Sequence, residues 1–186
     1  MSLLTANGLG RSFGATSIFA DIDLRIEAGD RIGLVGPNGE GKTTLLKLIA
    51  GIDPPTTGEI HRRRDLRVSY LAQDDGQPPE AQTLWVATLS AFAQLRELEQ
   101  QMHEQATRLV DDAALRRYAQ MQAEFERLDG YTYESRIKQV LEGLGFGEQD
   151  LQRPLPEFSG GQRTRAALGR LLLESPDLLL LDEPTN

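Results

Sequence analysis

Residues 31–46 read RIGLVGPNGEGKTTLL and change in character twice. The short apolar run at 32–35 predicts a buried strand, and the apolar spacing from Leu45 onward predicts a helix. Between them, the loop fits the pattern G-x-x-x-x-G-K-[ST]. Its fixed positions are Gly36, Gly41, Lys42 and Thr43. A strand before such a loop and a helix after it are the context in which the pattern binds phosphate.

This loop has the chemistry of an anion-binding site. Glycines allow successive backbone N–H groups to converge on a phosphate, and the positive N-terminal end of the following helix adds to the attraction. The pattern assigns Lys42 to the terminal phosphates and the Thr43 hydroxyl to Mg²⁺. The candidate nucleotide contacts are Gly36, Asn38, Gly39, Gly41, Lys42, Thr43 and Thr44. A glycine-rich turn without a ligand is the alternative, and the flanking strand and helix disfavour it.

The composition limits the kinds of protein that this chain can be. Its 186 residues suffice for one α/β domain with a sizeable core. A formal net charge of −8 argues against nucleic-acid binding through a general basic surface, although a local contact stays open. There is no cysteine and there are only two histidines, which excludes a disulfide framework, a thiolate metal site and a histidine-rich metal site.

The distribution of apolar residues gives no sign of a membrane protein. No apolar run approaches the roughly 20 residues of a membrane span. The first five residues lack the charged start and the apolar core of a signal peptide. We therefore expect a cytoplasmic protein without a membrane span.

Alternating or continuous apolar residues predict further strands. They are expected at 3–9, 21–27, 66–71 and 178–181. The last of these is apolar throughout, as expected for a central parallel strand covered on both faces. Asp182 and Glu183 follow it directly, and in an open α/β sheet ligands bind at the carboxyl ends of the strands. Two solvated charges at a strand end are the alternative.

Residues 84–128 contain neither glycine nor proline and predict a helical hairpin. Residues spaced alternately by three and four predict a coiled-coil seam along one helix, and the same spacing repeats along a second helix. Asp111 or Asp112 can cap this second helix. The seams include Met102, Met121 and Phe125. A structural spacer is the simplest role for the hairpin.

Three more helices are expected. One follows the phosphate loop and ends at Gly51, one lies at 134–144, and one begins at Ser159. Ser159 and Gln162 have the S-x-x-Q spacing of a capping box. Such a cap leaves the backbone amides of the two intervening residues near the surface. These residues are Gly160 and Gly161.

Together, these motifs resemble the nucleotide-binding domain of an ABC ATPase, and specifically that of the ABC-F family. The resemblance covers residues 3–186 and includes the phosphate loop, Gln73 at a strand end, and the segments 159–162 and 182–186. It implies that Asn186 at the end of the last segment is typical of ABC-F proteins. These proteins have two nucleotide domains in one polypeptide and mostly act on ribosomes.

The implied fold is α/β: a P-loop NTPase-type ABC nucleotide-binding domain. It has a mixed or parallel sheet core, an N-terminal antiparallel β part and an inserted α-helical hairpin arm. Residues 1–81 would form the ATP-binding core with its phosphate loop, and residues 82–131 the arm. Residues 132–186 would complete the helical subdomain and add the signature helix and the Walker B strand. Family members continue with a switch histidine and a second nucleotide domain, so we expect this chain to be the first half of such a protein.

The resemblance also implies roles for residues at matched positions, with ATP and Mg²⁺ as cofactors. Asp182 would hold Mg²⁺ directly or through water, together with Thr43 and Gln73. Glu183 would polarise the attacking water as general base, and Gln73 would help to place that water. Phe13 falls where the family has an aromatic residue that stacks on adenine, with core packing as the alternative.

The segment 159–162 resembles the signature that contacts the γ-phosphate held by the opposite nucleotide domain. A second nucleotide-binding domain, in the same polypeptide or in a second copy, is therefore an expected partner. Two residues depart from the family pattern. Phe158 replaces the commoner leucine before the signature, and Glu40 places a carboxylate inside the phosphate loop. We expect Glu40 to point outward, because a carboxylate directed inward would repel phosphate.

The function implied by the resemblance is ATP binding and hydrolysis in an ABC-F protein, acting on the ribosome in translation regulation or antibiotic protection. The hairpin resembles the arm with which family members touch the ribosome and its rRNA. Five arginines against seven acidic residues in 84–128 give little support for attraction to phosphates. Arg116 and Arg117 are the best candidates for such a contact. The cluster 61–64 is a second basic candidate, with a solvated turn as the favoured alternative.

Two other hypotheses stay open for the function. One is an ATPase subunit of an ABC transporter, and the other is a non-catalytic nucleotide-binding fragment.

Overall fold

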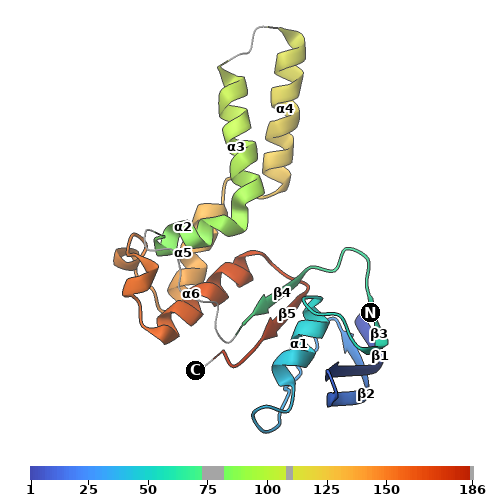
Figure 1. The fold of residues 1–186 in the computed structure, drawn as a ribbon. Helices are drawn as coiled ribbons and strands as arrows, with labels where there is room; N and C mark the ends of the chain where they lie inside the picture. The colour runs from blue at the N-terminus through green and yellow to red at the C-terminus, as the bar shows by residue number, and fades with distance from the viewer. Residues whose placement is uncertain (73–81, 108–110, 185–186) are drawn as a thin grey trace. The chain divides into compact units, whose positions relative to one another are not determined.

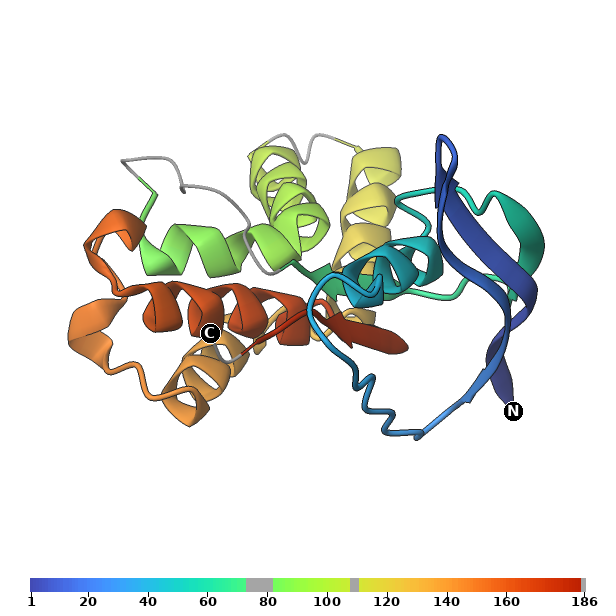
Figure 2. The ribbon, with the colours of Figure 1, turned by 60° about the horizontal axis from the view of Figure 1, so that its bottom comes forward.

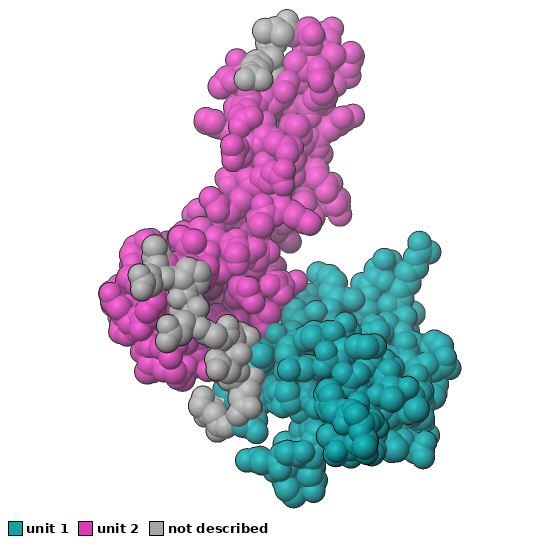
Figure 3. Space-filling model, viewed as in Figure 1, with its two compact units in different colours: residues 1–75, 175–186 teal, residues 76–174 magenta. Residues whose placement is uncertain are grey.

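The computed structural model describes residues 1–72, 82–107 and 111–184 (Figure 1). The chain forms two compact units, coloured separately in Figure 3. The first unit combines residues 1–75 with residues 175–186, and the second comprises residues 76–174. The first unit is therefore assembled from both ends of the sequence.

An antiparallel sheet forms one part of the first unit. Its strands, in order across the sheet, are β2 (Thr16–Glu27), β1 (Ser2–Phe13) and β3 (Thr57–Arg62). Apolar residues on one face of β1, among them Leu4, Ala6 and Leu9, are buried. The expected strands at 3–9 and 21–27 are confirmed, and both extend further along the hairpin. The sequence did not predict β3, because Ile60 is its only large apolar residue.

The rest of the first unit is one helix and two parallel strands. These are α1 (Lys42–Ala50), β4 (Val68–Leu71) and β5 (Leu178–Leu181). Leu45 and Ile49 of α1 pack with Leu180 of β5 and with buried residues of β1 and β2 in one apolar cluster. α1 ends at Gly51, as predicted. There the backbone is left-handed, with φ of 79°, and the Gly51 N–H donates to the Leu48 carbonyl oxygen.

The predicted strand at 32–35 is wrong. The structure has no strand there, and the side chains of Ile32, Leu34 and Val35 are exposed, that of Val35 to 95%. A buried strand needs hydrogen-bonded neighbours, and among the described residues β4 and β5 pair only with each other. For the same reason β5 is covered less than expected: Leu180 is buried, but Leu181 is exposed.

The basic cluster 61–64 does not form the expected solvated turn throughout. Arg62 ends β3, and its guanidinium donates to the backbone oxygens of Leu48 at 2.9 Å and Ile49 at 3.2 Å. The last carbonyls of a helix have no partner within it, and a cation is favourable at that end. Arg62 therefore stabilises the C-terminal end of α1.

The second unit is helical. In it, α6 (Gly160–Leu173) lies between α2 (Leu84–Leu89) and α5 (Tyr133–Gly143), as Figure 2 shows. Their apolar side chains share one buried cluster. The expected helices at 134–144 and from 159 onward are thus confirmed. No helix in the described parts of the chain is both long and apolar enough to cross a membrane.

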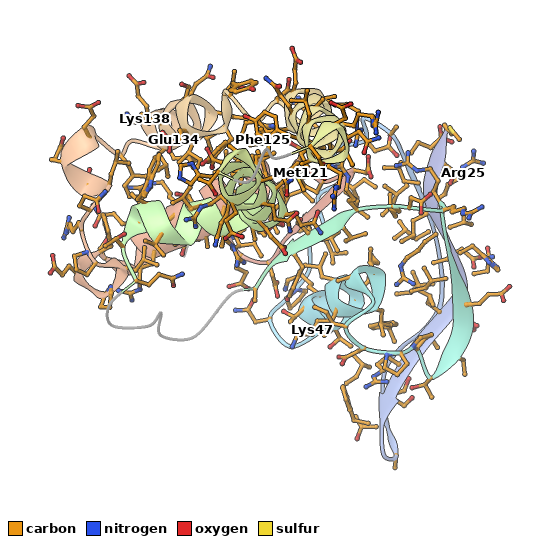
Figure 4. The ribbon with its side chains drawn as sticks, turned by 90° about the horizontal axis from the view of Figure 1, so that it is seen from above. Arg25, Lys47, Met121, Phe125, Glu134 and Lys138 are labelled. Carbon is orange, nitrogen blue, oxygen red and sulfur yellow. The ribbon has the colours of Figure 1, made fainter. Side chains whose placement is uncertain are left out.

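The predicted hairpin is present as α3 (Ala93–Ala106) and α4 (Asp112–Arg127), which lie side by side (Figure 1). Asp111 is the cap of α4, because its carboxylate accepts a hydrogen bond from the Ala114 N–H at 2.7 Å. Phe125 is buried in a cluster with Leu95 of α3, and Figure 4 shows it in a view along the hairpin. These two helices form the hairpin of the expected arm, residues 82–131.

The spacing predicted that the first seam follows a single helix, but the structure divides this stretch into two helices. A 3₁₀ segment, η1 (Ser90–Phe92), separates α2 from α3. The buried Thr88 hydroxyl donates to the backbone oxygens of Leu84 and Trp85, both at 3.0 Å, and the Ser90 hydroxyl donates to that of Ala87. Hydroxyls that bond to carbonyls of the preceding turn bend helices.

Candidate functional site

The phosphate loop turns on glycines in the left-handed conformation. Gly39 and Gly41 have φ of 87° and 93°, which residues with a side chain rarely adopt. Gly41 directly precedes α1, and a Cβ placed on it would lie 2.5 Å from Cγ2 of Ile18 on β2. Conformation and space therefore both require glycine at this position. The N-terminus of α1 can lie against β2 because of it.

The side chain of Lys42, the first residue of α1, folds back over the loop. Its Nζ donates to the backbone oxygens of Gly36 and Pro37, both at 2.8 Å. A phosphate oxygen is a better acceptor for an ammonium group than a neutral carbonyl, because both partners are then charged. The geometry thus places the ammonium group of Lys42 over the glycine-rich loop.

The loop, the start of α1 and the segment after β5 border a pocket of about 300 Å³. Its lining residues are Ile18, Asn38, Gly39, Gly41, Lys42, Thr43, Thr44 and Glu183. All of them except Ile18 are site candidates from the sequence. Gly36 is not part of this lining. Neither is Glu40, which is exposed. Its Oε2 lies over the loop, 3.2 Å from where a Cβ on Gly36 would be, so its exposure does not test the expectation that it points away from phosphate.

Asp182 and Glu183 differ in their surroundings. Asp182 is only 4% exposed, and its Oδ2 accepts a hydrogen bond from the Tyr70 hydroxyl of β4 at 3.0 Å. Its backbone N–H donates to the Leu71 carbonyl at 3.0 Å, which continues the pairing of β5 with β4. Glu183 has a φ of 46°, an uncommon left-handed conformation for a glutamate, and lines the pocket. Tyr70 had no signal in the sequence.

The residues present fit a magnesium ion bound through a nucleotide. Within the described ranges, no group of three or more His, Cys, Asp and Glu side chains could hold a metal by itself. Mg²⁺ usually takes one or two protein ligands and completes its shell with water and substrate phosphates. Thr43 on the pocket wall and the buried Asp182 suit that mode of binding.

Phe13 and the signature segment 159–162 do not line this pocket. Phe13, at the end of β1, is 54% exposed, so the alternative of core packing is wrong. The capping box is confirmed: Ser159 N–H donates to Gln162 Oε1 at 2.9 Å, and Gln162 N–H donates to Ser159 Oγ at 3.3 Å. The two glycines of the signature, Gly160 and Gly161, are exposed at the start of α6 in the second unit. Gln73 lies outside the described residues.

Comparisons with known proteins agree with this geometry. The family model described as "ABC transporter" matches residues 19–186. The chain belongs to this family. Its fold is the P-loop nucleotide-binding domain of ABC proteins, and such domains bind ATP, generally with Mg²⁺. A nucleotide-free ATP-binding cassette from an ABC transporter shares this fold, with a TM-score of 0.66 and 20% identity over 100% of this chain and 70% of its own.

Among curated relatives, the ABC domain is 41% identical to YdiF of Bacillus subtilis (strain 168). It is 37% identical to the tylosin resistance ATP-binding protein TlrC of Streptomyces fradiae. It is 36% identical to the energy-dependent translational throttle protein EttA of Haemophilus influenzae. These matches cover 100%, 100% and 91% of this chain, but 30%, 35% and 31% of the relatives. The chain therefore spans about a third of their length.

Proposed function

We propose that this chain is the ATP-binding and ATP-hydrolysing module of an ABC-F protein that acts on the ribosome. The observation that carries the proposal is the pocket, which brings Lys42 and Thr43 together with Glu183. These three side chains supply a cation for phosphate, a hydroxyl for a metal and a carboxylate for a water molecule. A turn without a ligand has no need of all three in one place.

Each side chain has a definite task in this proposal. Lys42 and the loop amides bind the terminal phosphates. Thr43 and Asp182 hold Mg²⁺, with Gln73 as a further ligand, and the ion neutralises phosphate charge when it is bound. Glu183 accepts a proton from the attacking water, which Gln73 helps to place. Tyr70 fixes the carboxylate of Asp182 through its hydrogen bond.

Hydrolysis is proposed for the complete protein, with a second nucleotide-binding domain as partner. The exposed start of α6 offers the free amides of a helix N-terminus to a phosphate. In the proposed arrangement this N-terminus, with Ser159 and Gln162 as its cap, contacts the γ-phosphate held by the other domain. Asp182 and Glu183 would act in the site that contains their own phosphate loop.

Two observations favour a role at the ribosome in the cytoplasm, in translation regulation or antibiotic protection. The relatives include a protein named as a translational throttle and one named for tylosin resistance. The chain also carries the arm, whose exposed arginines Arg116 and Arg117 lie on α4. We infer that these two residues contact rRNA phosphates. A transporter ATPase is the alternative, and the following experiment separates the two.

The test is co-sedimentation of the complete protein with ribosomes in the presence of ATP. We expect binding that weakens when Arg116→Gln and Arg117→Gln are combined, together with a smaller dependence on salt concentration. Arg127→Gln is the matched control, because this arginine of the same helix is already paired with Glu124. Recovery with membranes instead of ribosomes would favour the transporter alternative.

A further inference from the structure

The aromatic ring of Phe13 is covered on one face by an arginine of its own strand. Arg11 and Phe13 are two positions apart at the end of β1. The guanidinium carbon of Arg11 lies 4.7 Å from the centre of the Phe13 ring. This distance is within the range of a cation–π contact.

The guanidinium is fixed from a second direction. Arg11 Nη1 donates to the Pro54 carbonyl at 2.6 Å, in the segment that follows α1. Two more hydrogen bonds join the same pieces of chain: Ser12 N–H to Thr56 Oγ1 at 3.1 Å, and Thr56 N–H to the Gly10 carbonyl at 2.8 Å. The end of β1 is therefore held to the segment between α1 and β3.

One polar atom of this arrangement has no obvious structural use. Arg11 Nε is buried and has no hydrogen-bond partner among the described residues. Leaving a buried N–H without a partner is unfavourable for stability alone. A lysine or an apolar residue would avoid this loss, but neither presents a flat guanidinium to an aromatic ring.

We propose that Arg11 is a positioning residue for the base of the nucleotide. Its guanidinium stacks on one face of Phe13 and fixes the ring, whose exposed surface then receives an adenine. This inference rests on the proposed function, ATP binding by this chain, together with the expectation from the family resemblance that Phe13 stacks on the base of ATP. The same arginine connects that ring to the segment after α1, the helix whose N-terminus carries the phosphate loop.

The experiment compares two ligands in the full chain by titration calorimetry, each with Mg²⁺. ATP has a base, whereas inorganic tripolyphosphate has only the phosphates. We expect Arg11→Met to weaken ATP binding about two- to fivefold, the range that an exposed cation–π contact supports, and to leave tripolyphosphate binding unchanged. Phe13→Ala should weaken ATP binding about tenfold, because the stacking surface itself is lost.

Two more variants test the role of Arg11 further. Arg11→Lys retains the charge without the flat guanidinium, and we expect an affinity for ATP between those of the wild type and Arg11→Met. The double variant, Arg11→Met with Phe13→Ala, should bind ATP no more weakly than Phe13→Ala alone, because Arg11 acts through the ring.

The outcomes separate this inference from the proposed function. If Arg11→Met weakens both ligands equally, Arg11 has only a structural role and the inference is overturned. An unchanged affinity for ATP in Arg11→Met or in Phe13→Ala overturns it as well, while ATP binding by the chain still stands. Failure of the wild type to bind either ligand would refute both the proposed function and the inference.

Discussion

Asp182 and Glu183 are neighbours in the sequence but differ in surroundings. The first is buried and hydrogen-bonded to Tyr70 of β4, and the second lines the pocket. The backbone is left-handed at Glu183, directly after Asp182. Of the two adjacent carboxylates, one is therefore suited to hold a metal and the other to act on water.

Glu183→Gln should abolish turnover while ATP still binds. The amide has nearly the same shape but cannot accept the proton, and general-base catalysis contributes about 10²–10⁴ in rate. Steady-state hydrolysis by the complete protein and calorimetric ATP affinity are the two measurements. Glu59→Gln, on the exposed face of β3, is a matched control that should leave both unchanged. Near-normal hydrolysis by Glu183→Gln would remove this residue from the role of base.

Tyr70→Phe should destabilise the first unit without changing its side-chain packing. Loss of the phenolic oxygen takes a donor from the buried carboxylate of Asp182, and a hydrogen bond to a charged group is worth about 1.5–3 kcal/mol. We expect a lower urea midpoint at neutral pH. The control is Tyr131→Phe, which removes an exposed hydroxyl in the second unit. Equal midpoints for the two variants would show that the bond to Asp182 adds no stability.

The sequence predicts the residues of this site when their pattern is local. Lys42, Thr43 and Glu183 are identified by short motifs, and the structure places all three on one pocket. Tyr70 was missed because its partner lies far along the chain. Tyr70 bonds to a residue 112 positions away, and no spacing rule connects the two.

At the scale of elements, local sequence patterns predicted where helices and strands form better than they predicted which strands pair. The apolar run at 32–35 is a good strand sequence, but it pairs with neither β4 nor β5, and local apolarity does not specify a neighbour. The seam of the first hairpin helix has a regular spacing, yet the hydroxyls of Thr88 and Ser90 interrupt the helix. Both errors come from interactions that hydrophobic periodicity does not describe.

The parallel pair of strands is held at its start by one carboxylate. Asp177 Oδ2 accepts a hydrogen bond from the Arg67 N–H at 3.0 Å and lies 3.1 Å from Arg63 Nη2. Asp177 directly precedes β5, and Arg67 directly precedes β4. The hydrogen bond from the Arg67 backbone and the charge of Arg63 hold the pKa of Asp177 below its ordinary value of 3.8.

Asp177→Asn should lower the stability of the folded protein at neutral pH and should reduce the loss of stability that wild type shows at acidic pH. Folding lowers the pKa of Asp177, so its ionised carboxylate stabilises the folded state. This stabilisation is fully present at a pH above the ordinary pKa of the group. It is lost as the pH falls through the lowered pKa of the folded state. The difference in urea midpoint between wild type and variant should therefore be largest at neutral pH and shrink below about pH 4. A difference that stays constant with pH would show that the charge of Asp177 is not the cause.

At the scale of the whole molecule, the candidate site and the signature belong to different units. The pocket lies in the first unit, with residues from both ends of the chain, whereas Ser159 lies in the second. In the proposed mechanism the signature acts on a nucleotide held elsewhere, so changes in the two units have different effects. We expect Lys42→Ala to weaken ATP binding in its own pocket. A change at Ser159 should instead affect the complex in which two nucleotide-binding domains share the nucleotide.

Ser159→Asp should leave ATP binding unchanged and abolish hydrolysis by the complete protein. Aspartate caps a helix about as well as serine, so α6 stays intact, but its carboxylate repels the phosphate that the signature would contact. Ser159→Asn is the matched control, because it also caps the helix and carries no charge. The measurements are calorimetric ATP affinity, steady-state turnover and thermal unfolding. Equal turnover in the aspartate and asparagine variants, with equal stability, would mean that no phosphate approaches this helix end.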